Sequence, residues 1–177
     1  VRTFQDLLQN ADDERLFEYY AACQLVTVSS STAKVVQLCV GGLYTDAEWS
    51  PDEKYLLVTT LKRPFSYSVQ YDDFSRKTEI WDQKGKFVRT VAEFPVTDDT
   101  PRQGVVNGPR AFRWQALHPA RLLWSEALDG GDPTNKADFR DKLLRLDAHF
   151  SADPTEVLKT QHRLAGMTKK KKKDIVL

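Results

Sequence analysis

An internal repeat is the feature of this sequence that most constrains its fold. Residues 49–58 read WSPDEKYLLV, and residues 114–124 read WQALHPARLLW, which aligns with the first segment once one inserted residue is allowed. In both copies a Trp precedes a turn, and an apolar run follows that turn. The two Trp are 65 residues apart. A repeat whose unit is a small sheet is the signature of β-propeller blades.

Apolar and β-branched runs separated by Gly, Pro, Asp and Ser turns predict the strands of each copy. The first copy has such runs at 43–49, 54–61, 77–81 and 87–93, and the second at 111–114, 121–126, 142–147 and 156–160. Residues 23–28 and 33–39 predict a hairpin ahead of them. The predicted fold is all-β: a partial β-propeller of about two four-stranded antiparallel blades plus a flanking hairpin, with a short N-terminal helical segment.

Three domains follow from this pattern. Residues 1–22 are expected to be helical, because Asp12, Asp13 and Glu14 place negative charge where a helix N-terminus favours it,. Thr3 and Asp6 form a weak capping box for an earlier helical stretch,. The partial propeller covers residues 23–165. Residues 166–177 form a lysine-rich tail that we predict to be disordered.

The extra length of each repeat falls in particular connections. Residues 62–76 and 127–141 separate the second and third strands of the two blades, and 94–110 separate the blades. In an up-and-down blade, connections after the second and fourth strands emerge on one face. Long loops on a rigid scaffold are where function concentrates. We therefore expect this face to be the functional one, or the face that docks a partner domain.

The charge of the chain argues against a nucleic-acid partner. The formal net charge is +1, but Lys169–Lys173 supply five positive charges in one run. Without them, 21 basic residues face 25 acidic ones, so the folded part has no basic field for a phosphate backbone. We interpret the run as a solvated tail, or as a reading frame that has entered an A-rich tract, rather than as a nucleic-acid or membrane site.

Two cysteines and the absence of long apolar runs complete the composition. Cys23 and Cys39 fit no metal spacing, and buried thiols are favoured over a disulfide,. No run of 18 apolar residues exists, so no membrane span is expected,. The chain begins at Val1 without Met; we expect the natural N-terminus, with any targeting signal, to be missing.

No catalytic arrangement is recognisable. The sequence has no Gly-x-Ser-x-Gly elbow, His-Glu-x-x-His, P-loop or dinucleotide fingerprint,. His118, His149 and His162 have no ligand spacing, and surface or turn histidines are the simpler interpretation. We therefore expect no catalytic residue, metal or cofactor in this chain.

Two loop motifs are the candidate sites. Arg63, Phe65 and Tyr67 lie in an Arg-Pro-Phe-Ser-Tyr stretch, where a guanidinium suits carboxylate recognition,. The alternative is a loop that packs on its own aromatics. Asp129 and Asp132 lie in an Asp-Gly-Gly-Asp-Pro stretch that favours a tight turn and suggests a docking edge,; the alternative is a plain turn. We expect these five residues to face a substrate or to dock a domain.

These motifs carry a family resemblance. The sequence resembles the N-terminal propeller region of the glutamyl-endopeptidase-like branch of the prolyl oligopeptidase family of serine peptidases, from about Thr3 to Ala165. The resemblance rests on five stretches in matching order: 16–20 (LFEYY), 49–58, 63–67 (RPFSY), 77–88 and 126–133 (EALDGGDP). The chain departs from the pattern at Glu53, where the generic turn has Gly, in 97–108, and after Gly166.

The resemblance implies a two-part serine peptidase whose propeller covers an α/β-hydrolase domain and restricts access to peptide substrates. The catalytic triad belongs to that hydrolase domain, so none of its residues can be placed on this chain. The leading hypothesis is a non-catalytic propeller segment of such a peptidase. Its rival is a propeller that serves as a protein-interaction scaffold without enzymatic activity. We expect a periplasmic or secreted parent, with a plastid-like compartment as the alternative.

Overall fold

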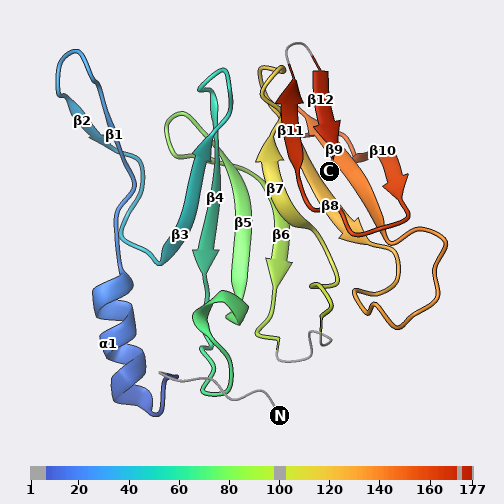
Figure 1. Cartoon of the computed structure of the whole chain (residues 1–177). Helices are drawn as coiled ribbons and strands as arrows, with labels where there is room; N and C mark the ends of the chain where they lie inside the picture. Colours follow the sequence, from blue (N-terminus) through green and yellow to red (C-terminus); the bar gives the residue numbers. More distant parts are fainter. Residues whose placement is uncertain (1–6, 98–102, 171–172, 177) are drawn as a thin grey trace. The chain divides into compact units, whose positions relative to one another are not determined.

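The structure is a computed structural model that describes residues 7–97, 103–170 and 173–176 (Figure 1). Its elements follow in chain order: α1 (Ala11–Ala21), β1 (Val26–Val28), β2 (Val35–Gln37), β3 (Tyr44–Trp49), β4 (Tyr55–Leu61), η1 (Tyr71–Asp73), β5 (Arg76–Asp82), β6 (Phe87–Phe94), β7 (Arg110–Trp114), β8 (Arg121–Ala127), β9 (Asp141–Asp147), β10 (Thr155–Thr160), β11 (Met167–Lys170) and β12 (Lys173–Val176).

Two four-stranded sheets contain most of the strands. Their strand orders are β3-β4-β5-β6 and β10-β9-β8-β7, so in each sheet every strand pairs with its neighbour in sequence. β5 and β9, the third strands of the two sheets, begin at Arg76 and Asp141, which restates the 65-residue period. The predicted all-β fold, with two four-stranded antiparallel sheets, a flanking hairpin and a short helix, is confirmed.

The chain divides into two compact units. The first comprises Val1–Glu48 and Leu56–Asp98, and the second comprises Trp49–Tyr55 and Asp99–Leu177. In the first unit, α1 begins after Asn10, whose side chain accepts hydrogen bonds from the backbone N–H groups of Asp12 and Asp13. This satisfies two donors that a helix start leaves open. The earlier capping box, Thr3 and Asp6, lies outside the described residues.

The inner strands form the core of each sheet. Leu56, Leu57 and Val58 are consecutive in β4, and all are at most 4% exposed. Because successive side chains of a strand point to opposite faces, both faces of β4 are covered. β8 repeats this arrangement with its own buried run, Leu122 to Trp124. Runs of this kind are typical of strands inside a stack rather than at a solvated surface.

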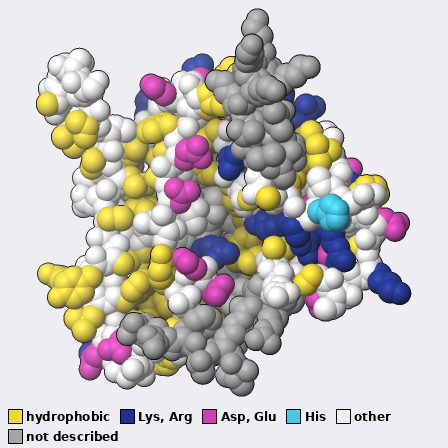
Figure 2. Space-filling model, viewed as in Figure 1, with side chains coloured by type: hydrophobic (Ala, Val, Ile, Leu, Met, Phe, Trp, Pro, Cys, Tyr) yellow, Lys and Arg dark blue, Asp and Glu magenta, His cyan; other side chains and the backbone are white. Residues whose placement is uncertain are grey.

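The hairpin β1–β2 differs from the rest of the first unit, because its side chains are exposed. Figure 2 shows apolar side chains on the hairpin and on α1, in agreement with the exposure of Val26, Val28 and Val35. Cys23 and Cys39 flank the hairpin as free thiols, one exposed and one partly exposed. The expectation of two buried thiols is therefore wrong, because the strands between the two cysteines, β1 and β2, expose most of their side chains.

The lysine-rich segment contains backbone strands β11 and β12, which pair as an antiparallel hairpin. These strands lie in the segment that the sequence analysis predicts to be disordered.

The three domain boundaries, at 1–22, 23–165 and 166–177, stay predictions. Among the described residues, no helix has the length and apolar character needed to cross a bilayer.

Candidate functional site

Arg63 lies at the start of the loop between β4 and β5, and it is bound to helix α1. Its Nε and Nη2 donate to the two carboxylate oxygens of Glu18 at 2.7 Å each, and its Nη1 donates to Glu14 at 2.6 Å. The hydrogen bond from Arg63 lowers the pKa of Glu18. This two-pronged geometry is the one that a guanidinium favours with a carboxylate. The Arg63 guanidinium is therefore already paired with two acidic side chains of this chain, Glu14 and Glu18.

Phe65 and Tyr67 also contact the body of the first unit. Phe65 is 7% exposed and stacks on Phe74 with ring centroids 5.3 Å apart, while Phe17 of α1 meets its ring edge-on at 5.2 Å. The Arg63 guanidinium lies 4.8 Å from the centre of the Phe65 ring. A hydrogen bond to Glu14 raises the pKa of Tyr67. This loop is thus built around its own aromatics, and among these three residues Tyr67 is the aromatic that stays half exposed.

Asp129, in the loop between β8 and β9, is the centre of a buried ion-pair network. Its side chain is fully covered and accepts hydrogen bonds from Arg140 at 2.8 Å and from Arg163 at 2.6 and 2.7 Å. Burial alone would raise the pKa of Asp129, but the bonds from Arg140 and Arg163 overcome it and lower the pKa to about 2. Asp129 is therefore a fixed negative charge that anchors two cations.

Asp141 extends this network from the first residue of β9. Its carboxylate is completely buried and accepts from Arg163 at 2.9 Å, from the backbone N–H of Leu164 at 2.7 Å, and from Arg110 of β7. Arg163 bridges Asp129 and Asp141, so the loop, β9 and the segment after β10 are tied to one another. Two buried acids facing three arginines satisfy the rule that buried charges are paired.

Asp132 and the two glycines shape the tip of the same loop. Asp132 accepts hydrogen bonds from the backbone N–H and the hydroxyl of Thr134, and the first of these is the main cause of its lowered pKa. Gly131 has a φ of +82°, and a Cβ at this position would overlap the carbonyl oxygen of Val105. That carbonyl belongs to the segment that follows β6, whose Val105 N–H donates to the Gly131 carbonyl at 2.9 Å. The loop and this segment are therefore in close contact.

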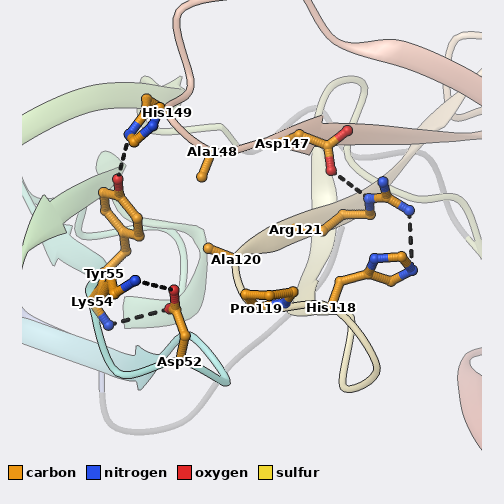
Figure 3. A pocket seen from close by; sticks show the side chains of 10 residues that line it. All are labelled: Asp52, Lys54, Tyr55, His118, Pro119, Ala120, Arg121, Asp147, Ala148 and His149. Atoms are coloured by element: carbon orange, nitrogen blue, oxygen red, sulfur yellow. Dashed lines mark hydrogen bonds and ion pairs between the residues drawn. The ribbon is translucent and has the colours of Figure 1, made fainter.

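A cavity of about 280 Å³ lies in the second unit, where β8 begins and β9 ends. This is the end of the two strands that is away from the loop that connects them. Three short turns surround it: 52–55, 118–121 and 147–149 (Figure 3). The backbone joins them directly, because Asp52 N–H donates to the Pro119 carbonyl and Ala148 N–H donates to the Ala120 carbonyl, both at 3.0 Å. The cavity therefore has a fixed frame.

Four polar side chains in this cavity are bonded in pairs. The Tyr55 hydroxyl lies 3.1 Å from His149 Nδ1, and Arg121 Nη1 lies 3.2 Å from His118 Nε2 (Figure 3). Arg121 also forms an ion pair with Asp147. No group of three or more metal-ligating side chains occurs among the residues described. The arrangement offers charged and hydrogen-bonding groups to a small ligand, but no assembled nucleophile and base.

Two curated proteins are similar to this chain over nearly its whole length. It is 38% identical over 170 residues to the "Probable glutamyl endopeptidase, chloroplastic" of Oryza sativa subsp. japonica, and 39% identical over 172 residues to the protein of the same name from Arabidopsis thaliana. These alignments cover 94% and 95% of the chain. The chain is therefore similar to one segment of each of these two longer proteins. It spans 18% of the length of each of these relatives.

The other comparisons add no further relative. No family model matches the chain, and no solved structure matches it. The similarity to the two plant proteins extends over nearly the whole chain, so it includes both repeat copies and both loop motifs. The relatives' names agree with the family resemblance that the Arg-Pro-Phe-Ser-Tyr and Asp-Gly-Gly-Asp-Pro stretches indicate.

Sequence reasoning finds the two long loops but misses the residues that bind them. The sequence marks Glu14 only as a negative charge near a helix N-terminus, and it assigns no partner to Glu18, Arg110, Asp141 or Arg163. Spacing gave no signal for them, because these residues lie 22 to 49 positions from the residues they bind. The sequence predicts His118 and His149 to be surface or turn residues. The structure places both in turns.

Proposed function

We propose that this chain is a non-catalytic propeller segment of a serine-type peptidase of the prolyl oligopeptidase family. In this proposal the segment covers an α/β-hydrolase domain of the same parent protein and helps to restrict which substrates reach it. The observation that carries the proposal is the buried network of Asp129, Arg140 and Arg163, which fixes the shape of a long loop. A loop held in this way presents a constant surface to a neighbouring domain or to a peptide.

The two long loops support the proposal in different ways. The functional groups of Arg63 and Asp129 are occupied by internal partners, so we assign these residues a positioning role. The surfaces available for contact are then those that the loops leave exposed, of which Tyr67 and Pro133 are examples, while Asp132 is half-buried. The homology to proteins named glutamyl endopeptidase supports a peptidase parent. Their chloroplastic label supports a plastid compartment and gives no support to a periplasmic or secreted one.

The test uses the full-length parent protein. If the loops restrict access, Asp129→Asn should loosen the β8–β9 loop and increase cleavage of a folded or long protein substrate relative to a blocked short peptide. Asp153→Asn, a change of an exposed acid after β9, is the matched control. An unchanged ratio of the two kcat/KM values, with the variant still folded, would count against a gating role.

A propeller that serves only as an interaction scaffold is the second candidate. The exposed apolar side chains of the β1–β2 hairpin favour it, since exposed apolar patches mark interaction sites,. Full-length protein that captures stable partners, and that cleaves no peptide under conditions where a related peptidase is active, would favour the scaffold.

A further inference from the structure

Asn107 and Gly108, shortly before β7, form a pair that has a reactivity of its own. The backbone nitrogen of the residue that follows an asparagine can attack the side-chain amide carbon and close a cyclic imide. The attack is easiest when that residue is glycine, because no Cβ blocks the approach. The sequence has three asparagines, and only Asn107 precedes a glycine.

The fold leaves this pair accessible and keeps its glycine in place. Gly108 has a φ of +143°, a conformation that residues with a side chain rarely adopt,. The side chain of Asn107 is exposed. In the described part of the chain, neither this side chain nor the Gly108 N–H has a hydrogen-bond partner. No described group therefore holds the amide carbon away from the attacking nitrogen.

The other two asparagines are held by hydrogen bonds. The side chain of Asn10 caps α1 by accepting from two backbone N–H groups of the first turn. The side chain of Asn135 donates to the carbonyl oxygen of Asp129 at 2.8 Å. Each is also followed by a residue with a Cβ, Ala11 and Lys136 respectively. Both asparagines are thus less reactive than Asn107 by position and by sequence.

The Asp129–Gly130 pair could close the same ring, but the fold prevents it. The Asp129 carboxylate is completely covered and is bound by Arg140 and Arg163. Its pKa is lowered to about 2, so it is ionised at neutral pH. An ionised carboxylate is a poor target for a nucleophile. The structure therefore singles out Asn107 among the residues that could react in this way.

The backbone on both sides of Asn107 is tied to the second long loop. Before it, the Val105 N–H donates to the Gly131 carbonyl at 2.9 Å. After it, Arg110 forms an ion pair with the buried Asp141. A change of backbone length at Asn107 must therefore be absorbed between two fixed points, and the weaker of the two contacts should open.

We propose that Asn107 is a site of spontaneous deamidation whose product loosens the contact of Val105 with Gly131. The Gly108 nitrogen bonds to the Asn107 side-chain carbonyl carbon and loses its proton, and the side-chain nitrogen leaves as ammonia. Water then opens the imide at either carbonyl, which gives an aspartate or an isoaspartate. The isoaspartate adds one atom to the backbone, and both products add a negative charge. The reaction needs only this chain and water, so the inference does not rest on the proposed function.

The first test measures the rate of deamidation in the whole 177-residue chain at mildly alkaline pH. A sample unfolded in urea and the free peptide 103–110 are incubated beside it. Trypsin releases the three asparagines in separate peptides, and mass spectrometry with electron-transfer fragmentation distinguishes aspartate from isoaspartate. In the folded chain Asn107 should react at least about tenfold faster than Asn10 or Asn135, because each of these must first break a hydrogen bond. Unfolding should speed up Asn10 and Asn135, whereas Asn107 should react at a similar rate in the folded chain and in the free peptide.

The second test measures the effect on the loop by hydrogen exchange of the Val105 amide. In the isoaspartate form, purified by ion exchange, this amide should exchange about tenfold faster, because its bond to Gly131 is lost. Asn107→Gln is the matched control, since its longer side chain closes an imide ring far more slowly. After the same incubation its Val105 rate should be unchanged. Fresh Asn107→Asp has the charge without the extra backbone atom, so it should exchange more slowly than the isoaspartate form.

Each outcome decides the proposal. It is overturned if Asn107 reacts no faster than the other two asparagines, or if folding slows Asn107 as much as it slows them. An isoaspartate form with unchanged Val105 exchange would overturn the effect on the loop. Equally fast exchange in incubated Asn107→Gln would do the same, because the loosening would then come from another residue. None of these results bears on the peptidase proposal, which is tested by cleavage ratios.

Discussion

The two long loops, 62–75 and 128–140, occupy the same position in their repeats but are held in different ways. The first is fixed by aromatic packing and by Arg63, whose side chain is 48% exposed at the surface of α1. The second is fixed by Asp129 and Asp141, whose side chains are completely covered. Ion pairs at an exposed surface contribute little to stability, whereas removing one partner of a buried network leaves an uncompensated charge.

This contrast teaches that one repeat can keep its strands while its loops change their chemistry. The strands must bury the same apolar runs, so they are constrained in both copies. The loops need only a stable shape, which an aromatic cluster with a surface clamp or a buried charge network can provide. The difference between the two loops should therefore appear in how much each loop loses when its anchor is removed.

The largest effect is expected for Asp141→Asn. The change leaves Arg110 and Arg163 facing a neutral amide in a fully covered position, and breaking a buried network in this way costs about 3–5 kcal/mol. Urea unfolding followed by Trp fluorescence measures the free energy of unfolding. Asp153→Asn is the control, and its change should stay within about 0.5 kcal/mol, as for most surface substitutions. Equal losses for the two variants would show that the network does not hold the unit together.

The contrast also shows what the sequence can and cannot predict. The strands follow from local signals, since each apolar run is bounded by turn residues, as at Ser50 and Pro51. The loop motifs stand out because Arg, Pro and aromatics are unusual together. The residues that anchor these loops cannot be predicted, because no local sequence signal marks Asp141 as the partner of Arg163. Exposure is also not local: Cys23 lies beside an apolar run, but the structure leaves it uncovered.

The next largest effect separates two adjacent glycines of the second loop. Gly130 and Gly131 both have positive φ, but only at Gly131 would a Cβ overlap a backbone carbonyl, that of Val105. Gly130→Ala should cost about 1 kcal/mol, the strain of a left-handed backbone. Gly131→Ala should cost about 3 kcal/mol, because backbone displacement is added to the strain. Thermal unfolding of both variants measures the difference, and equal costs would mean that the segment after β6 does not press on this loop.

A smaller effect is expected at the first loop. Arg63→Gln removes the clamp on α1, and Glu18→Gln removes its main acceptor. Because the pair is near the surface, the coupling energy from the double-mutant cycle should be about 0.5–1 kcal/mol and should fall with added salt. Arg15→Gln, an exposed helix position, is the control. A salt-independent coupling of several kcal/mol would place this clamp in the same class as the buried network and remove the contrast.

The last comparison between the loops is their acid titration. Asp129 has a pKa lowered to about 2, and the pKa of Glu18 is also lowered, by its bond to Arg63. For both acids the stabilisation is present above the unfolded pKa, near 4, and is lost as the pH falls through the folded value. We expect the stability from Asp129 to decline between about pH 4 and pH 2. Carbon-detected NMR of the carboxyl groups measures both values directly. If Asp129 titrates near its ordinary pKa of 3.8 in the folded chain, its arginines do not hold it, and the two loops are anchored alike.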